Sequence, residues 1–189
     1  MGSGHHYVYG RLQDFVTGEW LTDTDDERLR QKLARFLVDQ KGYLIADLRV
    51  RVHHDVSCGD LEGYSVTDLA VAPAGKVLMI LRYGPGSLVT RERPALAAAR
   101  TLEAGFCVPL AVVSNGNEAE VLDVRTGNVI DYGLENIPDR KALLERTDSF
   151  DCSSVSARQL EAEKRILMAY DGIEHSCTCT EDWCRPAKT

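Results

Sequence analysis

An almost unbroken apolar run at residues 76–83 constrains the fold of this chain most strongly. It has the sequence Lys-Val-Leu-Met-Ile-Leu-Arg-Tyr, and turn-forming segments enclose it, Pro-Ala-Gly at 73–75 and Gly-Pro-Gly-Ser at 84–87. A short apolar run between turn signals predicts a buried strand. The preceding residues 64–72 are rich in β-forming side chains. The two stretches together predict a hairpin.

The segments on either side of this hairpin predict helices and a further strand. Thr24 and Glu27 form a capping box, apolar residues follow at helical spacing, and Gly42 suits the left-handed end of that helix. Residues 44–56 alternate between apolar and polar side chains, which predicts a strand with one solvated face. An alanine-rich segment at 90–103 predicts a second helix.

The rest of the chain adds a strand, a second hairpin and two helices. An apolar strand is predicted at 108–113, and Asn-Gly and Thr-Gly-Asn turns then separate the hairpin strands 118–124 and 129–132. Short helices are predicted at 138–146 and, after a second capping box, from Ser156 onward. The order αβββαβ plus a β-hairpin predicts an α/β fold with a mixed central sheet flanked by helices. We expect an α/β domain at 7–146, and a linker, a helix and a cysteine-rich tail at 147–189.

Composition excludes several classes of protein. The 189 residues are 44% hydrophobic and 27% charged, which is typical of one soluble globular domain with an appendage. No apolar run approaches the roughly 18 residues that span a membrane, and the first residues lack the apolar stretch of a secretory signal. We therefore expect a cytoplasmic protein. The net charge of −7 argues against broad, non-specific attraction to nucleic acid.

The predicted central hairpin carries the candidate catalytic residues. Metal-dependent cleavage of a phosphodiester needs carboxylates that converge on Mg²⁺. Asp68 is the only acid in its β-rich strand, although a solvated acid at the end of a sheet is an equal alternative. On the next strand Ile80 or Leu81, depending on register, stands where a second carboxylate would lie. Arg82 retains a positive charge near the place of a lysine, but a guanidinium cannot act as a base.

Three segments around these residues resemble a known family. Residues 23–33, 80–93 and 113–123 are similar, in this order, to the type I restriction enzyme R-protein N-terminal domain family, over roughly residues 10–146. The resemblance implies a PD-(D/E)xK, restriction endonuclease-like core, with Mg²⁺-dependent DNA cleavage in the active members. Asp68 takes the place of the first catalytic acid, and Glu27 that of a helix glutamate that supports the metal. The second catalytic acid of the family, which lies on the next strand, has no counterpart in this sequence. The resemblance therefore implies a degenerate active site.

Two further features bear on this site. Glu92 could supply the missing acid, although a surface charge in the first turn of a helix is the more ordinary interpretation. The segment 82–100 is also a basic island, in which Glu92 is the only acid. Such an island beside glycines could bind phosphates, yet arginine clusters are about as often solvated or paired with acids. The candidate nucleic-acid-binding residues are Arg82, Arg91, Arg93 and Arg100.

The C-terminal tail presents a second candidate site. His175, Cys177, Cys179 and Cys184 could hold a structural Zn²⁺, but their spacing is irregular, and a reduced tail or a local disulfide are alternatives. The other three cysteines are expected to be reduced, because they lie far apart in the sequence.

Three hypotheses of function remain open from the sequence. The first is a nuclease-fold protein that has lost cleavage and serves as a nucleic-acid-binding or assembly module. The second is an active Mg²⁺-dependent endonuclease in which the catalytic acid is displaced. The third is a regulatory or homo-oligomerisation module organised by a zinc-binding tail. None of them involves a membrane.

Overall fold

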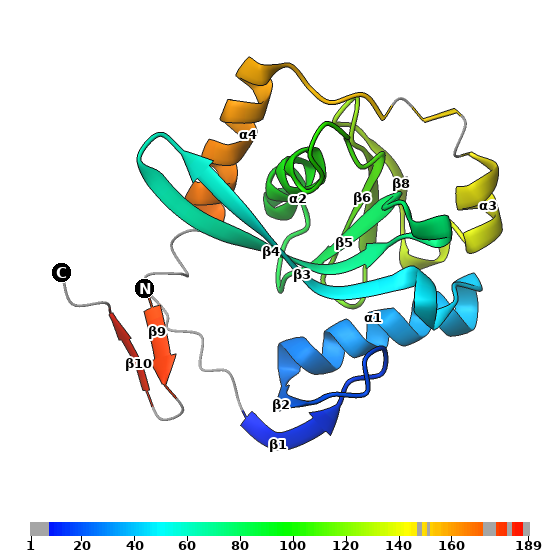
Figure 1. Ribbon diagram of the computed structural model, residues 1–189. Coiled ribbons are helices and arrows are strands. Elements are labelled where there is room, and N and C mark those ends of the chain that lie inside the picture. Colours follow the sequence, from blue (N-terminus) through cyan, green and yellow to red (C-terminus); the bar gives the residue numbers. More distant parts are fainter. Residues whose placement is uncertain (1–7, 147–148, 151, 172–176, 181–182, 187–189) are drawn as a thin grey trace.

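A six-stranded mixed sheet forms the centre of the protein (Figure 1). The computed structural model describes residues 8–146, 149–150, 152–171, 177–180 and 183–186, with only the backbone in the last two ranges. The strand order is β3-β4-β5-β6-β7-β8, in which β5 and β6 are parallel and all other neighbours are antiparallel. These strands are β3 (Leu48–Cys58), β4 (Leu61–Val71), β5 (Met79–Tyr83), β6 (Leu110–Ser114), β7 (Ala119–Asp123) and β8 (Val129–Tyr132).

Helices cover both faces of the sheet and make a three-layered α/β fold, as the sequence predicts. One face packs against α1 (Asp25–Lys41), and the other packs against α2 (Val89–Thr101) and α4 (Ala157–Tyr170) (Figure 1). The parallel crossover from β5 to β6 runs through α2. A short helix, α3 (Arg140–Glu145), follows β8 and a single 3₁₀ turn.

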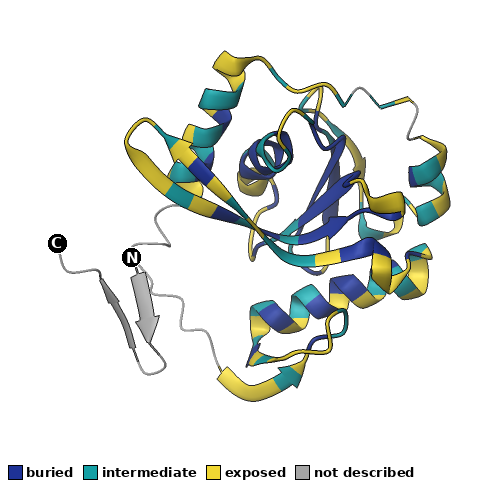
Figure 2. Cartoon of the chain, in the orientation of Figure 1, coloured by how far each residue is buried: buried dark blue, intermediate teal, exposed yellow. Residues whose placement is uncertain are grey.

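The apolar run that predicts a buried strand becomes β5, and it serves both cores. Met79 and Leu81 pack toward α1, whereas Ile80 packs toward the alanines of α2. All three side chains are fully buried, in agreement with the dark centre of the sheet in Figure 2. Side chains of this strand point alternately to the two faces of the sheet, and both faces are buried. Its sequence is therefore apolar throughout instead of alternating with polar residues.

The predicted start and end of α1 are confirmed, but the capping box is only half formed, because the Glu27 carboxylate binds Arg30 instead of the Thr24 amide. The hydroxyl oxygen of Thr24 accepts a hydrogen bond from the amide of Glu27 at 3.2 Å. Gly42 ends the helix in the left-handed conformation, with φ of 69°. Because acidic residues occupy the first turn, they also suit the positive end of the helix dipole. The helix that carries Glu27 is therefore fixed by local sequence.

Two small hairpins lie outside the central sheet, and neither was predicted. β1 (Val8–Gln13) pairs with β2 (Trp20–Thr24) and leads directly into α1. The turn of this hairpin carries Phe15 and Val16, which pack against the core on the α1 face. β9 (Cys177–Thr180) pairs with β10 (Trp183–Pro186).

The C-terminal helix α4 packs closely on α2 and the β3–β4 hairpin. Leu167 is 1% exposed and joins the core on that face. Glu163 is fully buried and pairs with Arg93 at 2.5 Å and with Arg100 at 2.8 Å, both from α2. Ser156 caps the helix as predicted, because its hydroxyl accepts the amide of Gln159. None of the helices in the described ranges is long and apolar enough to cross a membrane.

Leu167 anchors α4 to the core, and its replacement should destabilise the whole α/β domain. We expect Leu167→Ala to lower the free energy of unfolding by about 2–5 kcal/mol, because it removes buried methyl groups and leaves a cavity. Leu61→Ala is the matched control, since Leu61 is 62% exposed. Denaturant unfolding monitored by circular dichroism measures both changes. An equal effect of the two substitutions would show that α4 does not contribute to the core.

Candidate functional site

The candidate site lies where β4 and β5 separate. The two strands pair only from Leu69 to Val71 and from Met79 to Leu81, whereas β3 and β4 stay paired to their far ends. Asp68 is the first residue beyond this short ladder. Its Oδ2 atom accepts the backbone amide of Tyr83 at 2.8 Å, which gives that amide a partner where the ladder has ended.

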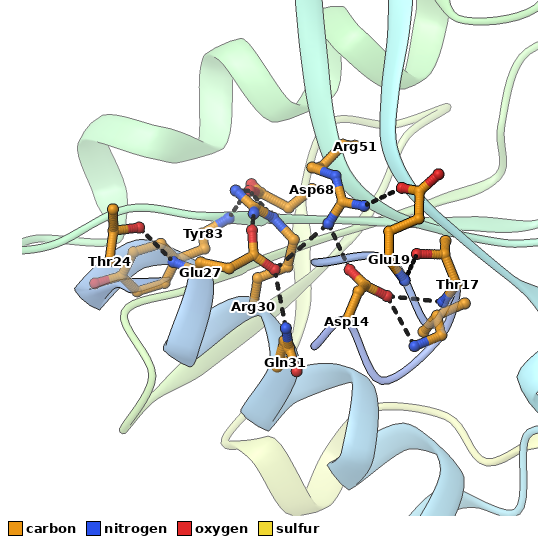
Figure 3. A network of polar contacts seen from close by, with 11 residues as sticks. Asp14, Thr17, Glu19, Thr24, Glu27, Arg30, Gln31, Arg51, Asp68 and Tyr83 are labelled. Atoms are coloured by element: carbon orange, nitrogen blue, oxygen red, sulfur yellow. Dashed lines mark hydrogen bonds and ion pairs between the residues drawn. The ribbon is translucent and has the colours of Figure 1, made fainter. Parts of the chain in front are cut away.

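Arg30 of α1 joins Asp68 to Glu27. Its Nε and Nη2 atoms donate to Oδ1 of Asp68 at 3.1 and 3.0 Å, and its Nη1 atom donates to Oε2 of Glu27. The side chains of Arg30, Glu27 and Asp68 are only 15%, 7% and 14% exposed. Figure 3 shows the guanidinium between the two carboxylates. The predicted pair Glu27 and Asp68 is therefore brought together, but through an arginine.

A second arginine extends the network to the N-terminal hairpin. Arg51 of β3 donates from Nη1 to Asp14 at 2.5 Å and to Oε1 of Glu27 at 3.4 Å (Figure 3). Burial acts to raise the pKa of Asp14, but hydrogen bonds from Arg51, Thr17 and Val16 outweigh it and lower that pKa. Asp14 is thus an ionised carboxylate, 2% exposed at its side chain, that pins the hairpin to the sheet.

The strand β5 adds no carboxylate to this cluster. Leu81 faces α1, on the same side as Arg30, and is fully buried. Arg82 lies on the opposite face, where it binds Asp171. The next residue on the α1 side is Tyr83, whose pKa is raised by burial and then by Asp26, Asp25 and Asp68, so that it is neutral. The structure therefore does not bring Arg82 to the side of Asp68.

The other candidate acid, Glu92, lies beside Glu120 of β7. Burial first, and then the charge of Glu92 and a hydrogen bond from it, raise the pKa of Glu120. Glu120 is 8% exposed, and its Oε2 atom has no hydrogen-bond donor among the described residues. No contact that the structure describes joins Glu92 to Asp68. Glu92, the candidate for a displaced catalytic acid, therefore belongs to a separate pair of carboxyl groups with Glu120.

Three of the four arginines of the basic island are paired with acids of the C-terminal helix region. Arg93 and Arg100 bind Glu163, and Arg82 binds Asp171, which follows the last turn of α4. Arg100 is also buried and donates to the carbonyl of Val124. Arg91 makes no ion pair within the described residues.

The side chains of the four predicted zinc ligands lie outside the part of the chain that the structure describes. His175 lies outside the described residues, and only the backbone of Cys177, Cys179 and Cys184 is described. Elsewhere in the described part of the chain, no group of three or more histidine, cysteine or acidic side chains is placed to hold a metal ion. The structural zinc and the homo-oligomer stay predictions.

The residues at the strand divergence do not fit a Mg²⁺ ion as they stand. Mg²⁺ requires several oxygen ligands in an octahedral arrangement and usually keeps bound waters. The carboxylates of Glu27, Asp68 and Asp14 each bind an arginine instead, and an aliphatic side chain occupies the α1 face of β5. The space between Asp14, Glu27 and Arg30 is also too small to hold a water molecule. The guanidinium groups supply the positive charge that a metal would otherwise supply.

Comparison with known proteins agrees with the resemblance seen in the sequence. A family model described as the type I restriction enzyme R protein N terminus matches residues 25–138. The chain belongs to this family. No curated protein and no solved structure matches the chain. The part that matches the R protein N terminus contains Glu27, Arg30 and Asp68, whereas Asp14 and α4 lie outside it.

Sequence reasoning missed Arg30, Arg51 and Asp14. The one available signal was the spacing of Glu27 and Arg30, because residues three apart on a helix are neighbours. Arg51 adopts a positive φ of 49°, which a strand pattern does not reveal. Asp14 comes from a hairpin that was itself not predicted.

Loss of Arg30 should destabilise the protein strongly. We expect Arg30→Met to lower the free energy of unfolding by about 3–5 kcal/mol, because Glu27 and Asp68 would be left as buried charges without a full set of partners. Arg28→Met is the matched control, since Arg28 is 51% exposed in its ion pair with Asp23 and should change stability little. Denaturant unfolding at neutral pH distinguishes the two. Similar losses would contradict a central role for Arg30.

The Glu92–Glu120 pair should make stability depend on pH. Since the pKa of Glu120 is raised on folding, the folded chain binds more protons than the unfolded chain above the ordinary carboxyl pKa. Stability from this group is therefore present at low pH and is lost as pH rises through the raised pKa. Glu120→Gln should be more stable than the wild type at pH 7, with an advantage that shrinks toward pH 4. Thermal melts across this range test it, with the 65% exposed Glu145→Gln as control. A loss of stability at pH 7 would refute the expectation.

Proposed function

We propose that this chain is a non-cleaving member of the R protein N-terminal family that binds nucleic acid. The observation that carries the proposal is the guanidinium of Arg30 between Glu27 and Asp68. These are the two carboxylates that the family resemblance assigns to a metal. Because an arginine neutralises both, the site can be stable without a divalent ion.

The proposal includes a PD-(D/E)xK assignment for the core. Its support is the sequence of elements after the N-terminal hairpin: α1, the antiparallel strands β3 to β5, the crossover helix α2 and the parallel strand β6. Asp68 lies at the divergence of β4 and β5, beside a glutamate of α1. In this assignment Leu81 and Tyr83 stand for the acid and the lysine of the motif, since both face α1.

Arg91 is the best-supported contact for a phosphate. Its guanidinium lies against the backbone of Gly84, so closely that a Cβ atom there would approach Cζ to 2.7 Å. It stands in the first turn of α2, where the helix dipole favours anions. Contacts of this kind position a protein on nucleic acid without reading its sequence. Since the other arginines of the island are paired, we expect the binding to be weak and salt-sensitive.

Binding can be tested with Arg91→Ala and labelled oligonucleotides. Fluorescence anisotropy at several salt concentrations should show weaker binding for the variant, to a similar degree for unrelated sequences, and a salt slope reduced by about one. Lys141→Ala is the control, since Lys141 is 84% exposed on α3 and is not part of the island. Unchanged affinity in Arg91→Ala, or no binding by the wild type, would exclude this function.

Cleavage provides the opposing test. We expect no nicking of supercoiled plasmid, linear DNA or RNA in Mg²⁺ or Mn²⁺, because β5 offers no second carboxylate. Nicking by the wild type that Asp68→Ala abolishes would overturn the proposal and favour an active endonuclease. Nicking that persists in Asp68→Ala would instead identify a contaminating nuclease.

A further inference from the structure

A second polar cluster lies on the other face of the sheet, beneath α4. Its centre is the carboxylate of Asp171, directly after the last turn of that helix. The Nη2 atom of Arg82 donates to both oxygens of this carboxylate at 3.0 Å, and the hydroxyl of Ser65 donates to Oδ2. Ser65 is fully buried, and the side chains of Arg82 and Asp171 are 17% and 14% exposed. A guanidinium and a hydroxyl thus donate to this carboxylate, as they would to a bound anion.

Other contacts anchor α4 without Asp171. Leu167 lies in the apolar core, and Glu163 binds two arginines of α2. The carboxylate of Asp171 is therefore additional to the packing that fixes the helix. A group that replaced this carboxylate would not have to undock α4.

The cluster also contains polar atoms that Asp171 does not satisfy. His54 lies directly opposite Ser65 in the β3–β4 ladder, and Thr67 follows Ser65 on the same face. The Oγ1 atom of Thr67 and the Nδ1 atom of His54 are buried without a hydrogen-bond partner among the described residues. Thr67 is itself fully buried. Buried polar atoms normally have partners, so that two such atoms on the face of the sheet that holds Ser65 favour a larger polar ligand.

The donors and acceptors match a phosphate group. The hydroxyl of Thr101 donates to the carbonyl of Ala97, which leaves its oxygen to accept the Nε2 hydrogen of His54. The Nδ1 atom of His54 is then an acceptor, able to receive the hydrogen of a P–OH group. Burial first, and then the charge of Arg82, lower the pKa of His54 to about 4, so that the ring is neutral. Arg82, Ser65 and Thr67 supply donors for the remaining phosphate oxygens.

We propose that Ser65, Thr67, Arg82 and His54 form a phosphate-binding site, which the carboxylate of Asp171 occupies as an intramolecular competitor. The site lies on the opposite face of the sheet from the Glu27–Arg30–Asp68 network. It deepens the proposed function, since nucleic acid is one source of the phosphate and free phosphate is the other.

The test compares phosphate affinity with and without the competitor. Asp171→Ala and Asp171→Asn remove the competing charge. Glu161→Gln is the matched control on the same helix, because Glu161 is 46% exposed and pairs with Lys164. The probe is inorganic phosphate at constant ionic strength, followed by ³¹P NMR titration and thermal shift. We expect both Asp171 variants to bind phosphate at least about tenfold more tightly than the wild type and the control, since a tethered competitor acts at a high effective concentration.

The combined variant Arg82→Ala with Asp171→Asn identifies the site. It should lose the gain in affinity, because the guanidinium that grips the anion is absent. Equal phosphate affinity in all chains, or a gain that survives Arg82→Ala, would overturn the inference. Circular dichroism establishes that each variant is folded, and Asp171→Asn preserves the size of the side chain should Asp171→Ala prove unstable.

A second comparison separates the two sources of phosphate and the two proposals. Oligonucleotides with and without a 5′-phosphate are titrated into Asp171→Asn, and a preference for the phosphorylated end assigns nucleic acid as the source. Equal binding of the two, together with tight inorganic phosphate, assigns free phosphate. Phosphate binding without any DNA binding would overturn the proposed function alone. DNA binding that depends on Arg91, without a phosphate gain in the Asp171 variants, would overturn this inference alone.

Discussion

The arrangement of the protein depends on one hydrogen bond in which a carboxylate replaces a backbone carbonyl. The amide of Tyr83 donates to Asp68 at the point where β4 turns away from β5. An amide without a partner at a sheet divergence would be costly, because buried backbone donors must be satisfied. Asp68 thereby lets the β3–β4 hairpin bend toward α4 while the centre of the sheet stays closed. The same carboxylate then requires a counter-charge, which Arg30 supplies.

The second principle of this structure is charge pairing between segments far apart in the chain. Arg51 reaches back to Asp14, whereas Arg30 reaches forward to Asp68 and Arg82 reaches forward to Asp171. Each pair joins a central element to a flanking segment or to the opposite layer. A pair of this kind contributes little net stability compared with a well-packed apolar contact, yet the loss of one partner is severe. Such pairs therefore specify which segments dock where, while the two apolar cores supply most of the stability.

The sequence predicted the parts of the fold that local patterns determine. Caps at Thr24 and Ser156, the turn signals around β5 and the strand β3 depend on neighbouring residues, and these predictions are confirmed. The single apolar face predicted for β3 is wrong, because Val50 packs toward α1 whereas Val52 and Val56 pack on the opposite face. It also predicted that β5 lacks a second acid. It did not reveal that Arg30 fills the gap between Glu27 and Asp68, because that contact joins positions 38 residues apart. The face of Arg82 was equally hidden, since an apolar strand buried on both sides offers no polar residue to mark its register.

The anchors at Asp14 and Asp171 have a topological consequence. Asp14 is held on the α1 face of the sheet, and Asp171 is held on the α4 face. The chain therefore enters the fold on one side of the sheet and leaves it on the other. The full thickness of the sheet therefore lies between the anchor at Asp14 and the anchor at Asp171.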